Sequence, residues 1–135
     1  MLTEEIIEPD TFQVSGDRVS VSVRMPWYRG LPLSSIGGIE FSIDGAVVPT
    51  ETLTFTVEGE TYTLAELAGR YDKAWYVLDS ATVEGELPDL SELSAGPDHE
   101  VSVLLNIYIP YLTVADDVMM IRERDTKTLK MKEIA

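Results

Sequence analysis

The chain of 135 residues has no cysteine and a single histidine, and each scarcity excludes a class of chemistry. Without cysteine there can be no disulfide, no zinc–thiolate site and no cysteine nucleophile. One histidine, His99, is too few for an HExxH motif or for a metal cluster of several histidines. Because it stands among turn residues in GPDHE, we interpret His99 as a surface-loop side chain without a function.

Basic residues are also few, with ten Lys and Arg against 24 Asp and Glu, so the formal net charge is -14. Phosphate backbones and anionic lipid surfaces repel such a chain, which argues against nucleic-acid and membrane-surface binding. Half of the basic residues crowd the C-terminal end, namely Arg122, Arg124, Lys127, Lys130 and Lys132. This pattern indicates a strand with a solvated basic face, and a docking strip for an acidic partner is the alternative.

Long apolar runs are missing as well. No stretch is long enough to span a bilayer, and the opening MLTEEIIEPD lacks the basic start and apolar centre of a signal peptide. We therefore expect a cytoplasmic protein. Hydrophobic residues still make up 44% of the chain. A chain of this length and composition is expected to form one domain, residues 1–135, around a real hydrophobic core.

The familiar catalytic motifs are absent too. Ser34 and Ser35 lack the G-x-S-x-G setting of a nucleophilic serine, and the SSIGG segment lacks the lysine of a phosphate-binding loop. Asp116 and Asp117 lack the glycine and the further acidic ligands of a calcium loop. Spacing does not test a pair of carboxylates that meet across a cleft, so a carboxylate-dependent hydrolase stays an alternative.

What the sequence does contain is a repeating two-residue period. Apolar and polar residues alternate, as in strands with one wet face, in DRVSVSVRM, GIEFSIDGAVVP and LTFTVEGETYTL. Asp44-Gly45 and Glu58-Gly59 stand where two-residue hairpin turns are expected, and Thr63 begins a capping box for one short helix. The predicted fold is an all-β antiparallel β-sandwich of about eight to ten strands, jelly-roll-like or immunoglobulin-like in its strand order.

The segment EVSVLLNIYIPYL differs from the others because it is apolar on both faces. Val101, Val103 and Leu105 share one face, whereas Leu104 and Tyr108 lie on the other. A strand of this kind is either central in its sheet or covered by a partner.

The most unusual segment is RMPWYRGLPLSSIGG, which places Trp27, Tyr28 and Arg29 between two prolines. Proline removes a backbone donor and fixes its φ angle, so the segment predicts a stiff loop rather than a ladder strand. Two interpretations are open: Trp27 seals the core, or the loop contacts a partner or ligand, as Trp, Tyr and Arg commonly do in interfaces. A second aromatic–proline segment, NIYIPYL, favours the contact surface and adds Tyr108 and Tyr111 as contact residues.

Several of these segments together resemble one known family. In the order EEIIEPDTFQV, RMPWYRGLPLSSIGGIEFSIDG, YTLAELAGRYDKAWYVLD, YIPYL and DTKTL, the chain resembles, nearly end to end, the small β subunit of bacterial C-glycoside deglycosidases. The resemblance implies a β-sandwich bound to a larger α subunit, a TIM barrel similar to sugar-phosphate isomerases and epimerases. It also implies that this barrel holds a divalent metal, commonly manganese, and the acid–base residues.

The same resemblance implies a reaction and a role for this chain. Enzymes of the family act on 3-oxo-glucosides whose sugar is joined through carbon to a flavonoid or other aromatic aglycone, and the aglycone departs by an elimination-like step. A metal acting as a Lewis acid beside a general base suits that chemistry. Because the family's metal ligands and base belong to the α subunit, this accessory chain is expected to contribute no catalytic residue, metal ligand or cofactor. The alternative is a stand-alone module that stacks sugars or aromatic glycosides on Trp27, Trp75 or the tyrosines.

Overall fold

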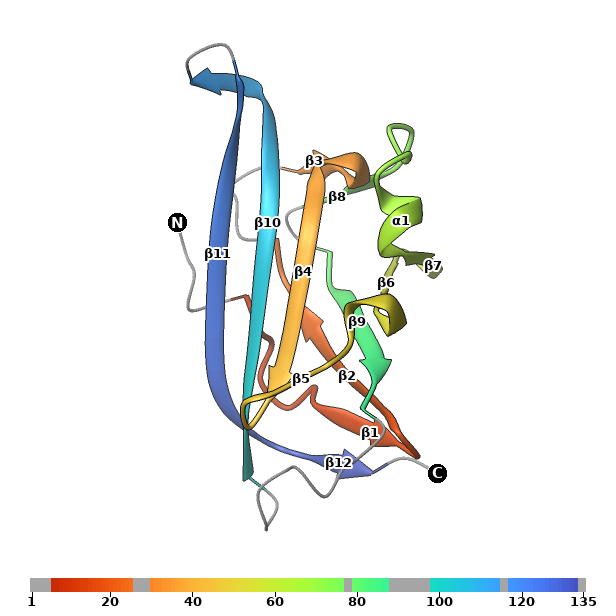
Figure 1. Ribbon diagram of the computed structural model, residues 1–135. Coiled ribbons are helices and arrows are strands. Elements are labelled where there is room, and N and C mark those ends of the chain that lie inside the picture. The colour runs from red at the N-terminus through yellow and green to blue at the C-terminus, as the bar shows by residue number, and fades with distance from the viewer. Residues whose placement is uncertain (1–5, 26–29, 77–78, 88–97, 115–116, 134–135) are drawn as a thin grey trace.

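The computed structural model describes residues 6–25, 30–76, 79–87, 98–114 and 117–133, with the backbone alone described at 110–114, 118 and 133. Twelve strands are found among these residues, in two main sheets and one small pair (Figure 1). The six-stranded sheet has the order β12 (Lys132–Glu133), β1 (Gln13–Ser15), β2 (Arg18–Val23), β9 (Ala81–Glu86), β6 (Thr54–Val57) and β7 (Glu60–Thr63). The four-stranded sheet has the order β11 (Asp117–Lys130), β10 (Asp98–Val114), β4 (Ile36–Ile43) and β5 (Ala46–Val47), and β3 (Leu31–Pro32) pairs with β8 (Ala74–Trp75).

Antiparallel pairing dominates both sheets, which confirms the predicted all-β fold. The one parallel pairing among the described strands joins β1 to β12. The predicted number of strands, about eight to ten, is too low because β3, β5, β8 and β12 have two residues each. Strands this short leave no two-residue period in the sequence, and they form only where the rest of the fold places a neighbour beside them.

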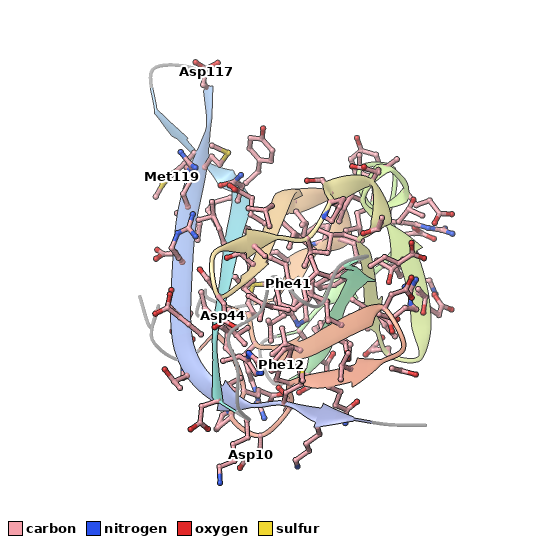
Figure 2. The ribbon with its side chains drawn as sticks, turned by 60° about the horizontal axis from the view of Figure 1, so that its bottom comes forward. Asp10, Phe12, Phe41, Asp44, Asp117 and Met119 are labelled. Carbon is pink, nitrogen blue, oxygen red and sulfur yellow. The ribbon has the colours of Figure 1, made fainter. Side chains whose placement is uncertain are left out.

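The two main sheets enclose one hydrophobic core, to which the longer strands contribute alternate residues. Along β2 the side chains alternate between half-buried and buried, and Val101, Val103 and Leu105 of β10 are fully buried. Phe12 and Phe41, both fully buried, lie inside the molecule in Figure 2. The alternation expected from the sequence is thus confirmed, and β10 is central in its sheet, between β11 and β4.

Two hairpin turns have the backbone that their sequences predict. Asp44 and Gly45 have φ angles of 53° and 86°, and Glu58 and Gly59 have φ angles of 52° and 78°. Positive φ at both central residues is typical of the type I′ turn, whose twist matches that of the flanking strands. The first turn joins β4 to β5 and the second joins β6 to β7, so local sequence alone sets the register of both hairpins.

The predicted helix is α1 (Leu64–Leu67), which starts with the expected capping box. Thr63 donates its backbone N–H to Glu66 Oε1 at 2.8 Å, and this hydrogen bond lowers the pKa of the Glu66 carboxyl. The cap therefore adds stability above the unfolded pKa of a glutamate and loses it as the pH falls through the lower folded pKa. Leu67 is fully buried and packs the helix against the core. In the described part of the chain, no helix is long and apolar enough to cross a membrane.

The interpretation of His99 as a surface-loop residue is wrong. Its side chain is 2% exposed, because β10 begins at Asp98 and carries His99 into the interior. Nδ1 lies 2.6 Å from Oδ2 of Asp44 in the β4–β5 turn, and the ring packs edge-on against Phe12. The other carboxylate oxygen of Asp44 accepts the backbone N–H of Glu100 at 2.8 Å. Asp44 thus ties a hairpin turn to the start of the central strand.

Replacing Asp44 by alanine should lower the free energy of unfolding by about 2–3 kcal/mol, because the buried His99 ring loses its hydrogen-bond partner. The positive φ of Asp44 adds to the loss, since alanine tolerates that backbone less well than aspartate or asparagine. Asp44→Asn keeps a side-chain oxygen and the turn preference, so it should cost clearly less. Urea denaturation of the isolated chain measures both variants, and equal losses would contradict this view of the pair.

Candidate functional site

Of the five contact residues predicted from the sequence, Trp27, Tyr28 and Arg29 lie outside the described residues. Tyr111 belongs to β10, and its side chain is also outside the described part of the structure. Tyr108 is described in full, and its side chain on β10 is 42% exposed. The candidate site is therefore built outwards from Tyr108.

Tyr108 lies on the side of the four-stranded sheet that points away from the core. We define this outer face by residues of three strands that lie side by side in Figure 1, namely Gly37, Gly38 and Glu40 of β4, Leu104, Asn106 and Tyr108 of β10, and Met120, Arg122 and Arg124 of β11. Met120 is directly opposite Tyr108 in the β10–β11 register, and Arg122 is opposite Asn106. Beyond this pair, β10 and β11 continue past the other strands towards Asp117, which lies far from the core in Figure 2.

The glycine pair of β4 makes room for side chains of β10. The register between the two strands shifts between Asn106 and Ile107, so Gly37 is an extra, bulged residue there. A methyl group on Gly37 would lie 2.6 Å from Cε2 of Tyr108, and one on Gly38 would lie 3.1 Å from Nδ2 of Asn106. Both side chains therefore rest directly on glycine backbone, which gives the Tyr108 ring a defined seat on the outer face.

A cavity of about 410 Å³ lies beside the same glycines, between β4 and α1. Its polar lining includes Glu40 and Asn106, and its apolar lining includes Leu64, Ala65 and Ile36. Pockets that bind small molecules usually measure roughly 300–1,000 Å³.

Two arginines of β11 are held on the outer face by neutral side chains. Arg122 Nε donates to Asn106 Oδ1 at 3.1 Å, and Arg124 Nη1 donates to Ser102 Oγ at 3.0 Å. Neither guanidinium forms an ion pair with a carboxylate of the described residues. Both side chains are exposed, so the basic face predicted for this strand is confirmed at these two positions.

Lys127 departs from that predicted basic face. Its ammonium group is half-buried and lies 2.6 Å from Oδ2 of Asp125, a carboxylate that is 5% exposed. The same Asp125 oxygen accepts the backbone N–H of Ile7 at 2.8 Å. This pair therefore belongs to the structural interior, where it ties the N-terminal segment to β11.

Trp75 is unavailable as a stacking surface, so the expectation that sugars or aromatic glycosides stack on this residue is wrong. The side chain is fully buried, Nε1 donates to the backbone oxygen of Asp79 at 2.9 Å, and the ring packs edge-on against Phe55 at 5.1 Å between centroids. Among the described residues, no three His, Cys, Asp or Glu side chains gather as metal ligands would.

Comparison with known proteins decides the family. The family model of the C-glycoside deglycosidase beta subunit matches residues 3–111. The chain belongs to this family. A C-glycoside deglycosidase beta subunit from Microbacterium trichothecenolyticum is 41% identical over 131 residues, covering 96% of this chain and 97% of the relative. Another from Arthrobacter globiformis is 38% identical over 133 residues, covering 98% and 99%. The 3'-dehydrocarminate deglycosidase beta subunit of a Microbacterium species is 39% identical over 134 residues, covering 99% and 98%.

The resemblance noted in the sequence is thus confirmed, and the match to the C-glycoside deglycosidase beta subunits includes most of the outer face. Residues 3–111 contain β4 and most of β10, and with them the seat of Tyr108. The alignments with the three relatives extend over nearly the whole chain and so reach β11 as well. Sequence reasoning missed Met120 and the glycine seat, although the two-residue period of β11 places Met120 on the opposite side from the buried Ile121.

Proposed function

We propose that the chain is the β subunit of a C-glycoside deglycosidase and acts only in complex with a larger α subunit. The observation that carries this proposal is the match along nearly the whole chain to relatives named as beta subunits of such enzymes. A subunit needs a surface for its partner, and the half-exposed Tyr108 and Met120, opposite each other on the outer face, support one.

The catalytic machinery is assigned in this proposal to the α subunit, a TIM barrel similar to sugar-phosphate isomerases and epimerases. The divalent metal, proposed to be manganese, is assigned to the barrel together with the acid–base residues, and the described residues of this chain gather no three His, Cys, Asp or Glu side chains as metal ligands would. Active sites of such barrels lie at the C-terminal ends of the strands, which a neighbouring subunit can reach. The β subunit would stabilise the barrel or line the mouth of its pocket.

The proposed substrates are 3-oxo-C-glucosides of flavonoids and other aromatic aglycones. One relative is named for a 3'-dehydro compound, which supports an oxidised sugar as the substrate. A ketone at C3 acidifies the hydrogen on C2, so a general base can remove that proton. The bond from C1 to the aromatic carbon then breaks, the aglycone carbon takes up a proton, and the sugar leaves as an unsaturated 3-oxo product. No water is consumed, so the enzyme is proposed to be a lyase.

The contacts with the α subunit are proposed to come from five aromatic and basic side chains of this chain. Large amphipathic side chains of this kind supply most of the binding energy in many protein interfaces. Two segments contribute them, and the residues are Trp27, Tyr28, Arg29, Tyr108 and Tyr111.

Reconstitution from separately purified subunits tests the proposed function. The α subunit, this chain and the mixture are each incubated with a 3-oxo-C-glucoside and manganese, and aglycone release is followed by chromatography. Release should require both subunits, and a chelator should stop it while leaving the thermal unfolding of the isolated chain unchanged. Turnover by this chain alone would favour a hydrolase, and tight glycoside binding by this chain alone would favour a stand-alone binding module; either result would overturn the proposal.

Replacing Gly37 by alanine should weaken binding to the α subunit about tenfold, a loss of about 1.4 kcal/mol. The new methyl group would displace the exposed Tyr108 ring from its seat, and exposed rings move at little cost to the fold, so unfolding should change by less than about 1 kcal/mol. Gly69→Ala is the matched control, because its methyl group would meet only Glu66 O, at 3.9 Å. Biolayer interferometry measures the affinities, and equal binding of both variants would contradict the role of the seat.

A further inference from the structure

We propose that the outer face docks the α subunit through carboxylates that bind Arg122 and Arg124, with Tyr108 and Met120 at the apolar centre of the contact. The inference rests on the proposed function, which supplies the partner. Beyond that function, we infer that the α subunit covers the outer face and that charge pairs hold it there. The basic residues of β11 then act as the docking strip that the sequence left as an alternative.

The first support is that Arg122 and Arg124, unlike the other described arginines, have no carboxylate partner among the described residues. The chain has a net charge of -14, and each of the other described arginines forms an ion pair with a carboxylate. Arg122 and Arg124 form none with the described residues, although both are exposed. Their hydrogen bonds to Asn106 and Ser102 orient the guanidinium groups without neutralising them.

The geometry of the two guanidinium groups matches carboxylates of a protein partner. An arginine offers five N–H donors in a planar fork that binds a carboxylate through two parallel hydrogen bonds. Arg122 bonds through Nε and Arg124 through Nη1, so further donors remain on both. The side chains are two positions apart on one side of β11, which separates them by roughly 7 Å along the strand. Two neighbouring acidic side chains of one partner surface span that separation.

The apolar centre is the second support. Among the described residues five large hydrophobic side chains are exposed, and two of them, Tyr108 at 42% and Met120 at 44%, are directly opposite each other beside the arginines. Tyrosine, methionine and arginine are enriched in protein interfaces relative to other surfaces. The seat on Gly37 holds the Tyr108 ring in place, so less side-chain entropy is lost when a partner covers it.

The acidic residues around the two arginines decide what kind of anionic partner can bind. Glu40 stands on the same face and the chain as a whole is strongly acidic, so a nucleic acid or an anionic membrane would be repelled at every further contact. A protein surface with a few carboxylates avoids that repulsion, because its acidic groups need lie only opposite Arg122 and Arg124. The partner is therefore an acidic patch of the α subunit.

Binding of the α subunit to this chain at several salt concentrations tests the inference. Arg122→Gln with Arg124→Gln should weaken binding at least about tenfold at low salt and reduce the dependence of affinity on salt, since charge pairs are lost. The charge-matched control is Arg18→Gln with Lys73→Gln, whose cations pair with Glu86 and Glu60 of the six-stranded sheet. The control pair should bind like the unmodified chain, and thermal unfolding verifies that both double variants are folded.

Carbodiimide cross-linking tests the chemistry of the partner directly. The amine introduced by Arg124→Lys should couple to an aspartate or glutamate of the α subunit, and mass spectrometry of the linked peptides identifies it. If the unmodified chain binds the α subunit and the Arg122→Gln, Arg124→Gln variant binds equally well, the docking face is overturned while the proposed function stands. If the unmodified chain does not bind the α subunit at all, the proposed function and the docking face both fail.

Discussion

Replacing Trp75 by alanine should lower the free energy of unfolding of the isolated chain by about 3–5 kcal/mol. Trp75 is fully buried, packs edge-on against Phe55, and satisfies its indole N–H on the backbone of Asp79. Alanine would leave a large cavity lined by core side chains and remove that hydrogen bond. Since domains of this size are stable by only about 5–15 kcal/mol, much of the total would be lost.

The adjacent residue supplies the control for this loss. Tyr76 is 56% exposed, so Tyr76→Ala should change the free energy of unfolding by less than about 0.5–1 kcal/mol. Chemical denaturation followed by circular dichroism compares the two variants with the unmodified chain. A Trp75→Ala chain as stable as the Tyr76→Ala chain would show that the region around β8 packs differently from the arrangement described above.

Replacing Trp27 by alanine should have the opposite pattern of effects. We expect the isolated chain to stay folded and its affinity for the α subunit to fall roughly 30-fold or more, the loss of about 2 kcal/mol that marks an interface hot spot. The basis is the sequence, in which Trp27, Tyr28 and Arg29 stand between two prolines. Arg29→Lys should also bind poorly, because an ammonium group cannot replace a guanidinium that grips a carboxylate with two hydrogen bonds.

Two readouts separate the alternatives for Trp27. Circular dichroism and thermal unfolding report on the isolated chain, and a binding titration with the α subunit reports on the interface. Loss of the folded state would support the interpretation that Trp27 seals the core. Unchanged folding together with unchanged binding would contradict both interpretations.

Features set by neighbours in the sequence could be predicted. The turns at Asp44-Gly45 and Glu58-Gly59 depend on backbone preferences of two adjacent residues, and the capping box depends on residues three apart. The two-residue period of β2 and β10 reflects one buried face, which any sheet with a core requires. Each of these signals is local, so the sequence contains all that is needed to find it.

Features set by distant parts of the chain could not be predicted. His99 stands in a turn-like sequence, yet β10 already includes it and its side chain is buried, with a hydrogen-bond partner, Asp44, that is 55 residues away. The sequence does not show that Trp75 is interior, because its burial depends on packing against Phe55, 20 positions earlier in the chain. The parallel contact of β1 with β12 joins the two ends of the described chain and leaves no pattern in either.

In the candidate site, too, some features are set by neighbours in the sequence and others by distant parts of the chain. An outward Tyr108 follows from the alternation along β10, but its seat on Gly37 depends on a bulge in the pairing of β4 with β10. The basic residues of β11 are visible as a run, whereas the neutral partner of Arg122 is set by the β10–β11 register. Sequence therefore identifies the kinds of side chain in the site, and the fold decides which of them lie together.

Co-purification tests most directly the central claim that this chain works as one subunit of a larger enzyme. The chain, carrying the only affinity tag, is co-expressed with its proposed α subunit, and the eluate is examined by native mass spectrometry and assayed for aglycone release. We predict one complex that contains both proteins in fixed proportion and holds all of the activity. Elution of this chain by itself, with the proposed α subunit active in the flow-through, would contradict that claim.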